Sequence, residues 1–193
     1  MIGCSCGAKK IKILRNFKKQ PICNKFKKKK DTKEYKHPII LTQCNQCGLL
    51  QLKKHVPYDK ILPRVNWLKY KEPEKHLTHL AGVVSKLKNI PKKAVACGLT
   101  YKDDPLLKKL YKKSYKKNWR IDPVKDFNLK FSNIASEGII PKITKKNILK
   151  LEKKYGKPDL LVARHILEHT NHTNYFLNLI TSFVKPGVYI IFE

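Results

Sequence analysis

The chain has 193 residues, of which 43 are Lys or Arg and 14 are Asp or Glu, so its formal net charge is +29. Because 41% of its residues are hydrophobic, it can bury a core, and a wholly disordered basic tail is excluded. It has no run of about 18 apolar residues and no apolar stretch of a signal peptide at its start, so we expect a cytoplasmic protein that neither crosses nor binds a membrane.

The first predicted unit, residues 1–56, is a small β module. Short extended segments rich in β-branched or apolar residues lie at 11–14, 38–42 and 49–52. Two cysteine pairs surround these segments, in the manner of a zinc ribbon.

The two pairs are Cys4 with Cys6 and Cys44 with Cys47. Glycine follows the second cysteine of each pair and lets backbone N–H groups approach the sulfurs. Two short-spaced thiolate pairs separated by a few tens of residues are typical of a tetrahedral zinc site. Unrelated thiols and disulfides are the alternatives, and the lack of an export signal argues against disulfides. We therefore predict that these four thiolates bind Zn²⁺.

The other two cysteines, Cys23 and Cys97, stand alone in the sequence. We expect both to be small buried hydrophobic residues.

A helical linker is predicted at residues 57–90. Residues 57–72 form a proline-containing connection. From Glu74 to about Asn89, apolar residues recur at steps of three and four, which indicates one amphipathic helix.

From residue 91 to 193, short apolar segments alternate with helical patterns. This alternation predicts an α/β fold with a Rossmann-like parallel sheet of about five strands. The predicted strands are 94–98, 119–122, 138–140, 158–164 and 188–192. The predicted helices are 105–117, 125–135, 145–155 and 174–184.

Ligands of such sheets bind beyond the carboxyl ends of the strands. Gly98 ends the first predicted strand, and Asp122 ends the second. An acid at this position can accept hydrogen bonds from both hydroxyls of an adenosine ribose. The alternatives for Asp122 are a helix cap and a solvated turn.

The loop after the first strand favours one class of nucleoside ligand. It contains a single glycine and no G-x-G-x-x-G pattern, whereas a pyrophosphate would need more backbone N–H groups. Asp103 and Asp104 beside it would repel phosphate but suit a cationic sulfonium. This balance favours S-adenosylmethionine over NAD.

Several motifs together resemble a known family. The motifs occur along the chain in the same order as in that family. They are residues 21–26 (PICNKF), 44–52 (CNQCGLLQL), 158–169 (PDLLVARHILEH) and 184–187 (VKPG). The chain resembles class I methyltransferases with an N-terminal zinc-binding domain, a family that includes sugar-nucleotide C-methyltransferases.

The resemblance implies that S-adenosylmethionine is the cofactor and that a small-molecule acceptor, a sugar nucleotide or a related small metabolite, receives the methyl group. The cofactor would contact Gly98, Asp103, Asp104, Asp122 and His165. The first motif departs from the family, because its glycine-rich loop is reduced to residues 98–104.

In the resembling family, the acceptor-binding and base residues follow the fifth strand. We therefore assign no catalytic base, and expect this chain to be a fragment or a stand-alone subunit. A partner chain is then expected to cover the last strand.

The basic charge supports a competing function. Only four of the 43 basic residues are Arg, and lysine is scattered along the chain, which is typical of codon bias in an AT-rich genome. Such a surface attracts nucleic acid non-specifically and in a salt-dependent way, without the bidentate contacts that arginine makes to bases. The alternative function is a non-enzymatic, zinc-containing basic protein that binds nucleic acid or an acidic partner.

Residues 165–169 (HILEH) also spell the H-x-x-E-H pattern of a zinc protease. That chemistry requires both histidines on one face of a helix. Because the preceding residues predict a buried strand, we expect no protease site here.

Overall fold

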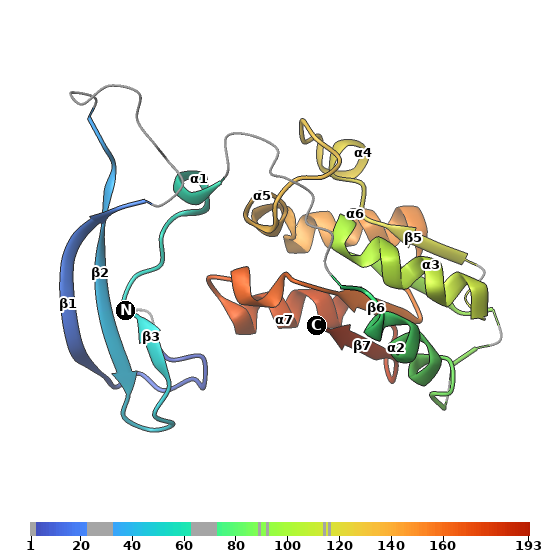
Figure 1. Ribbon diagram of the computed structural model, residues 1–193, viewed down its shortest axis with the longest axis horizontal. Coiled ribbons are helices and arrows are strands. Elements are labelled where there is room, and N and C mark those ends of the chain that lie inside the picture. Colours follow the sequence, from blue (N-terminus) through green and yellow to red (C-terminus); the bar gives the residue numbers. More distant parts are fainter. Residues whose placement is uncertain are drawn as a thin grey trace. The chain divides into compact units, whose positions relative to one another are not determined.

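In the computed structural model, the chain divides into two compact units, Met1–Arg64 and Val65–Glu193, and each unit has its own sheet (Figure 1). No helix among the described residues is long and apolar enough to cross a membrane. The residues that the structure describes are 3–22, 33–62, 73–88, 90–91, 93–113, 115 and 117–193.

The N-terminal unit contains a three-stranded antiparallel sheet of order β1-β2-β3. All three strands predicted in this unit are confirmed, and the first two are longer than expected. They are longer because they pair with each other from Ile11 opposite Cys44 to Pro21 opposite Lys36. The elements of this unit are β1 (Ile11–Pro21), β2 (Lys36–Cys44), β3 (Leu50–Leu52) and the short helix α1 (Tyr58–Ile61).

This sheet buries few side chains. In β1 every residue after Ile11 is exposed. Within the described part of the unit, the buried residues are Cys4, His37, Thr42 and Cys44. So small an interior supplies little hydrophobic stabilisation, and a unit of this kind needs a further source of stability.

The C-terminal unit contains a four-stranded parallel sheet of order β5-β4-β6-β7. The predicted α/β fold with a Rossmann-like parallel sheet is confirmed, with four strands in place of about five. The strands are β4 (Val95–Gly98), β5 (Lys117–Arg120), β6 (Leu160–Ala163) and β7 (Tyr189–Phe192).

Helices pack on both faces of this sheet (Figure 1). The α-helices are α2 (His76–Val84), α3 (Asp104–Lys113), α4 (Pro123–Phe127), α5 (Ser136–Ile139), α6 (Lys145–Tyr155) and α7 (Thr173–Phe183). Three 3-10 turns are η1 (Tyr101–Asp103), η2 (Ile140–Lys142) and η3 (Leu167–His169).

The two faces of the sheet have separate sets of packing contacts. On one face, Ala81 of α2 and Leu106 of α3 belong to the same buried cluster as Val162 of β6. On the other face, the Trp119 ring of β5 stacks on Tyr155 of α6 with 4.2 Å between centroids. All four residues of β6 are buried, as expected for a central parallel strand.

The strand order reverses beside β4. The chain passes from β4 through α3 to β5 on one side, and then returns to β6 on the other side. The carboxyl ends of β4 and β6 therefore flank the position where ligands of doubly wound sheets bind.

Two predicted elements are wrong. Residues 138–140, expected to be a strand, lie in α5 and η2, where Ile139 and Ile140 are buried. Pro141 follows them and cannot donate a ladder hydrogen bond, which disfavours a strand. The helix expected at 125–135 ends at Phe127, because Asn128 adopts a left-handed conformation with φ of 54°.

Candidate zinc site and cofactor crevice

The four predicted zinc ligands converge in the N-terminal unit. The Sγ atoms of Cys4, Cys6, Cys44 and Cys47 all lie within 4.8 Å of one another. The Cys4–Cys47 and Cys6–Cys44 sulfur distances are 3.6 and 3.7 Å. A Zn–S bond of about 2.3 Å in a tetrahedron requires sulfurs about 3.8 Å apart, so the site fits Zn²⁺. A disulfide would need sulfurs about 2.05 Å apart.

Tight turns hold each pair in place. The N–H of Gly48 donates to the Cys44 carbonyl at 3.1 Å, and the N–H of Gly7 donates to the Cys4 carbonyl at 2.8 Å. Both glycines have positive φ, 75° and 89°, which a residue with a side chain rarely adopts. The β1–β2 pairing places Ile11 opposite Cys44 and brings the two turns together.

The thiols differ in acidity. The backbone N–H groups of Cys47 and Gln46 lower the pKa of Cys44 to about 6. The N–H of Cys6 lowers the pKa of Cys4, but burial and the neighbouring thiols raise it to about 12. Four thiolates at this spacing repel one another, so a cation is required to keep them all ionised. Cys97 is buried in β4, as predicted, and Cys23 lies outside the described residues.

The ends of three strands are joined by hydrogen bonds at one edge of the C-terminal sheet, where we expect the cofactor crevice. The N–H of Ile121, just after β5, donates to the Gly98 carbonyl at 3.0 Å. The N–H of Leu99 donates to the Val162 carbonyl of β6 at 3.3 Å. Asp122 therefore lies one residue beyond the point where β5 joins β4.

Gly98 lets the following turn pack against the strand. A Cβ at this position would lie 2.8 Å from the Cβ of Asp103 and 2.9 Å from Cδ1 of Leu107. These are closer than non-bonded carbon atoms approach. Close packing is therefore sufficient to explain why glycine is required at this position.

Asp103 is fully buried. Its Oδ2 accepts hydrogen bonds from the N–H groups of Leu99 and Thr100, both at 2.7 Å, and its Oδ1 accepts from the N–H of Arg164 at 2.8 Å. Burial raises the pKa of Asp103 to about 7, although these N–H groups and the Arg164 charge lower it. Asp103 thus joins the β4 loop to the end of β6, and the sulfonium contact expected from the sequence stays a prediction.

The two other predicted acids lie nearer the surface. Asp104 forms an ion pair with Arg120 at 3.0 Å, which compensates its charge. Asp122 caps α4, because its Oδ1 accepts from the N–H groups of Val124 and Lys125 at 2.9 and 3.2 Å.

Asp122 keeps a second oxygen for other contacts. Its Oδ2 lies 3.9 Å from Nζ of Lys125, and its side chain is 32% exposed. Partial burial raises the pKa of Asp122, but the N–H groups of Lys125 and Val124 outweigh this and lower it. Asp122 is therefore an ionised helix cap with one carboxylate oxygen at the surface.

A cluster of charged side chains lies at the end of β6, and the sequence analysis did not predict it. The buried Arg164 guanidinium donates to Glu193 at 2.6 Å and to the Lys102 carbonyl. Glu193 also pairs with His76 at 2.8 Å. His165 follows with φ of 49°, and its N–H donates to the Glu193 carbonyl at 2.7 Å. A lone arginine after four apolar strand residues is the sequence signal of this cluster.

The H-x-x-E-H segment is divided between a loop and a short 3-10 turn. His165 lies in a loop and His169 ends the turn η3, so no single helix carries both. His169 instead pairs with Glu137 at 2.8 Å. Among the described residues, the group with metal-ligand spacing is the cysteine cluster.

Comparison with known proteins supports the N-terminal site. Residues 4–61 match the family model Methyltransf_13, described as "Putative zinc binding domain". A comparison with curated proteins found no match. The matched segment contains all four clustered cysteines, which supports a methyltransferase-associated zinc-binding domain in the N-terminal unit.

Proposed function

We propose that the chain is an S-adenosylmethionine-dependent methyltransferase whose C-terminal unit binds the cofactor at the carboxyl ends of β4, β5 and β6. The observation that carries this proposal is the reversal of strand order beside β4, with Gly98 and Asp122 at the ends of adjacent strands. The methyltransferase-associated zinc domain in the same chain supports it.

The crevice fits the adenosine end of the cofactor better than the methionine end. Asp122 offers an ionised carboxylate oxygen that can accept hydrogen bonds from ribose hydroxyls. The N–H groups of Leu99 and Thr100 are already bonded to Asp103 and do not fit a methionine carboxylate in this conformation.

The proposed cofactor contacts are Gly98, Asp103, Asp104, Asp122 and His165. Bound S-adenosylmethionine would supply an electrophilic methyl group. Asp122 would fix the nucleoside by its ribose, and positioning of this kind accounts for much of the rate in group transfer.

We propose a sugar nucleotide or a related small metabolite as the methyl acceptor, because the sequence motifs resemble sugar-nucleotide C-methyltransferases. No residue is assigned as catalytic base. β7 is an edge strand of the sheet, and we retain the proposal that a partner chain covers it.

Calorimetric titration of the zinc-loaded chain with S-adenosylhomocysteine tests the proposal. We expect micromolar binding, weakened about tenfold or more by Asp122→Asn, because a hydrogen bond to a charged acceptor contributes about 1.5–3 kcal/mol. Asparagine keeps an oxygen that can cap α4, so the variant should fold.

Glu152→Gln is the matched control. Glu152 is a surface acid whose partner is Lys157 at 3.7 Å, and its loss should leave the affinity unchanged. Absence of binding by the folded wild-type chain would rule out the proposed cofactor.

The second candidate is a zinc-containing basic protein that transfers no group. The internally bonded N–H groups of Leu99 and Thr100 favour it, since they leave that loop less able to hold a ligand. This candidate predicts no S-adenosylhomocysteine binding and strongly salt-dependent binding of polyanions.

A further inference from the structure

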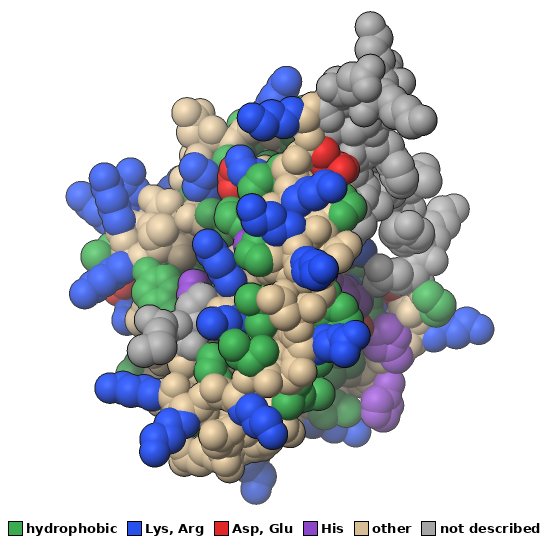
Figure 2. All heavy atoms as spheres, turned by 90° about the vertical axis from the view of Figure 1, so that its left-hand side faces the viewer, with side chains coloured by type: hydrophobic (Ala, Val, Ile, Leu, Met, Phe, Trp, Pro, Cys, Tyr) green, Lys and Arg blue, Asp and Glu red, His purple; other side chains and the backbone are tan. Residues whose placement is uncertain are grey.

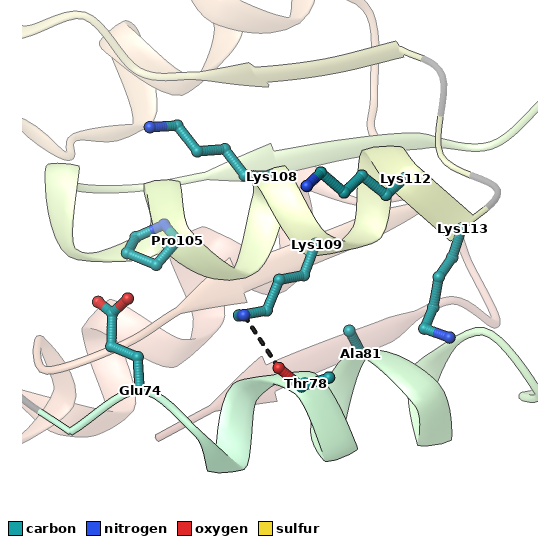
Figure 3. A pocket seen from close by; sticks show the side chains of 8 residues that line it. All are labelled: Glu74, Thr78, Ala81, Pro105, Lys108, Lys109, Lys112 and Lys113. Atoms are coloured by element: carbon teal, nitrogen blue, oxygen red, sulfur yellow. Dashed lines mark hydrogen bonds between the residues drawn. The ribbon is translucent and has the colours of Figure 1, made fainter.

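A lysine-lined groove lies between α2 and α3 of the C-terminal unit. Its volume is about 620 Å³. In Figure 3, Lys109 and Lys113 extend from α3 toward α2, and Ala81 and Pro105 contribute apolar surface. The charged lining residues are Glu74, Lys108, Lys109, Lys112 and Lys113.

The positive charge of this groove is not balanced by acids. Lys109 donates to the Thr78 hydroxyl at 2.9 Å, which leaves its charge uncompensated. In the part of the chain that the structure describes, none of the four groove lysines forms an ion pair with a carboxylate. Lysines elsewhere do form such pairs, as Lys154 does with Asp126 at 2.7 Å. Glu74 is the one carboxylate among the lining residues.

The lysines are regularly spaced along α3. Lys108 and Lys112 are four residues apart, as are Lys109 and Lys113, and each step corresponds to a rise of about 6 Å along the helix. Two rows of cations at this spacing match the successive phosphates of an extended nucleic acid strand. Lysine binds phosphates as a point charge, without reading sequence.

An aromatic side chain accompanies the lysines. Tyr111 is 52% exposed on α3. It lines a second groove of about 500 Å³, which shares Lys108 and Lys112 with the first. This second groove also contains Arg120 and its ion-pair partner Asp104. Non-specific single-strand binding combines a basic groove with an aromatic ring on which a base stacks.

We propose that single-stranded nucleic acid binds along α3, with its phosphates on Lys108, Lys109, Lys112 and Lys113 and a base against Tyr111. An acidic protein would use the lysines equally well but would gain nothing from an exposed ring beside them. This proposal does not rest on the proposed methyltransferase activity, although Asp104 of the second groove is also a proposed cofactor contact.

The test must distinguish binding in the groove from binding to the basic surface as a whole. Figure 2 shows Lys and Arg side chains spread over the face that it presents, with Asp and Glu much rarer among them. A diffuse surface of this kind binds polyanions by itself. The control variant therefore has to remove the same charge from another helix.

The experiment measures the fluorescence anisotropy of a labelled oligouridylate with the full, zinc-loaded chain over a range of salt concentrations. The groove variant replaces Lys108, Lys109, Lys112 and Lys113 with Gln. The control replaces four exposed lysines of α6 with Gln, namely Lys145, Lys146, Lys150 and Lys153. Glutamine is a good helix former, so both variants should fold, which circular dichroism checks.

We expect the groove variant to lose about tenfold or more in affinity and its salt slope to fall by up to about 3, since each phosphate contact on a single strand contributes about 0.7. The α6 control should change little. Equal losses in the two variants would overturn the proposal in favour of a diffuse lysine surface, and no loss in the groove variant would also overturn it.

Three single substitutions test the proposal further. Glu74→Gln should tighten binding, because it removes the acid from the groove. Tyr111→Leu should weaken binding by severalfold, whereas Tyr175→Leu, at an exposed tyrosine of α7, should not. Binding of a poly-glutamate peptide of equal charge with the same affinity and the same response to Tyr111→Leu would overturn the choice of nucleic acid.

Discussion

Gly98 has little space around it although it has no side chain. The atoms that a Cβ would meet belong to Asp103 and Leu107, at 2.8 and 2.9 Å. Both are buried in the turn and helix that follow β4. Alanine at this position would push that turn away from the sheet and disturb the hydrogen bonds of Asp103.

We therefore predict that Gly98→Ala lowers the free energy of unfolding by about 1–3 kcal/mol, the usual cost of overpacking a core. Urea denaturation of the full chain measures it. Gly82→Ala is the control, since no atom lies within 4 Å of the position of its Cβ and α2 is helical there. It should be neutral or stabilising by up to about 1 kcal/mol. Equal midpoints for the two variants would contradict the packing argument.

At the residue scale, the zinc ligands were predictable and the burial of Asp103 was not. Thiolate spacing and the following glycines are local properties of the sequence, and they are sufficient to identify Cys4, Cys6, Cys44 and Cys47. Asp103 is buried because the N–H of Arg164, 61 residues later, closes over it. No local pattern contains that contact, so the sequence alone suggested a carboxylate that faces a ligand.

At the element scale, the long periodic segments were predicted best. The helix expected at 145–155 coincides with α6, since its apolar residues repeat at helical spacing and Thr144 caps its start. The apolar run at 138–140 was misassigned, because a run of this length does not distinguish a strand from a buried helical turn. Its side chains are buried as a strand's would be, so the error concerned hydrogen bonding and not burial.

Glu137 of α5 forms a hydrogen-bonded ion pair with His169, with 2.8 Å between Oε1 and Nδ1. The hydrogen bond to Glu137 raises the pKa of His169, and the same bond lowers the pKa of Glu137. Stability from His169 is present below its ordinary pKa of 6.5 and is lost as the pH rises through its raised value. Stability from Glu137 is present above 4.5 and is lost as the pH falls through its lowered value.

We therefore predict a pH window for the coupling between these two residues. A double-mutant cycle with Glu137→Gln and His169→Gln should give about 0.5–1 kcal/mol at a pH between 4.5 and 6.5, since both side chains are partly exposed. The coupling should disappear in alkaline solution. Urea denaturation at several pH values measures it.

The control is the cycle of His169 with Glu168, whose carboxylate is more exposed and 4.0 Å away. Its coupling should be smaller at every pH. A Glu137–His169 coupling that does not change with pH would show that the two side chains interact without the charge on the imidazole.

At the scale of the whole molecule, the two units rely on different sources of stability. The C-terminal unit buries apolar side chains on both faces of its sheet, among them all four residues of β6. The N-terminal unit exposes nearly all of β1, and half of its buried residues in the described segments are the zinc ligands Cys4 and Cys44. Metal binding should therefore supply most of the folding free energy of the N-terminal unit.

Removal of zinc should consequently affect the two units unequally. In differential scanning calorimetry, we expect the zinc-loaded chain to show two transitions, and a chelator should abolish the one that belongs to the N-terminal unit. Cys44→Ser should have the same effect and remove bound zinc, because Cys44 has the lowest pKa of the three cluster thiols whose pKa is shifted, Cys4, Cys44 and Cys47. Cys97→Ala, in the buried core of β4, should keep a full complement of zinc and shift only the other transition. If the chelator left both transitions in place, the packing of the sheet alone would suffice to fold the N-terminal unit, and zinc would have no structural role there.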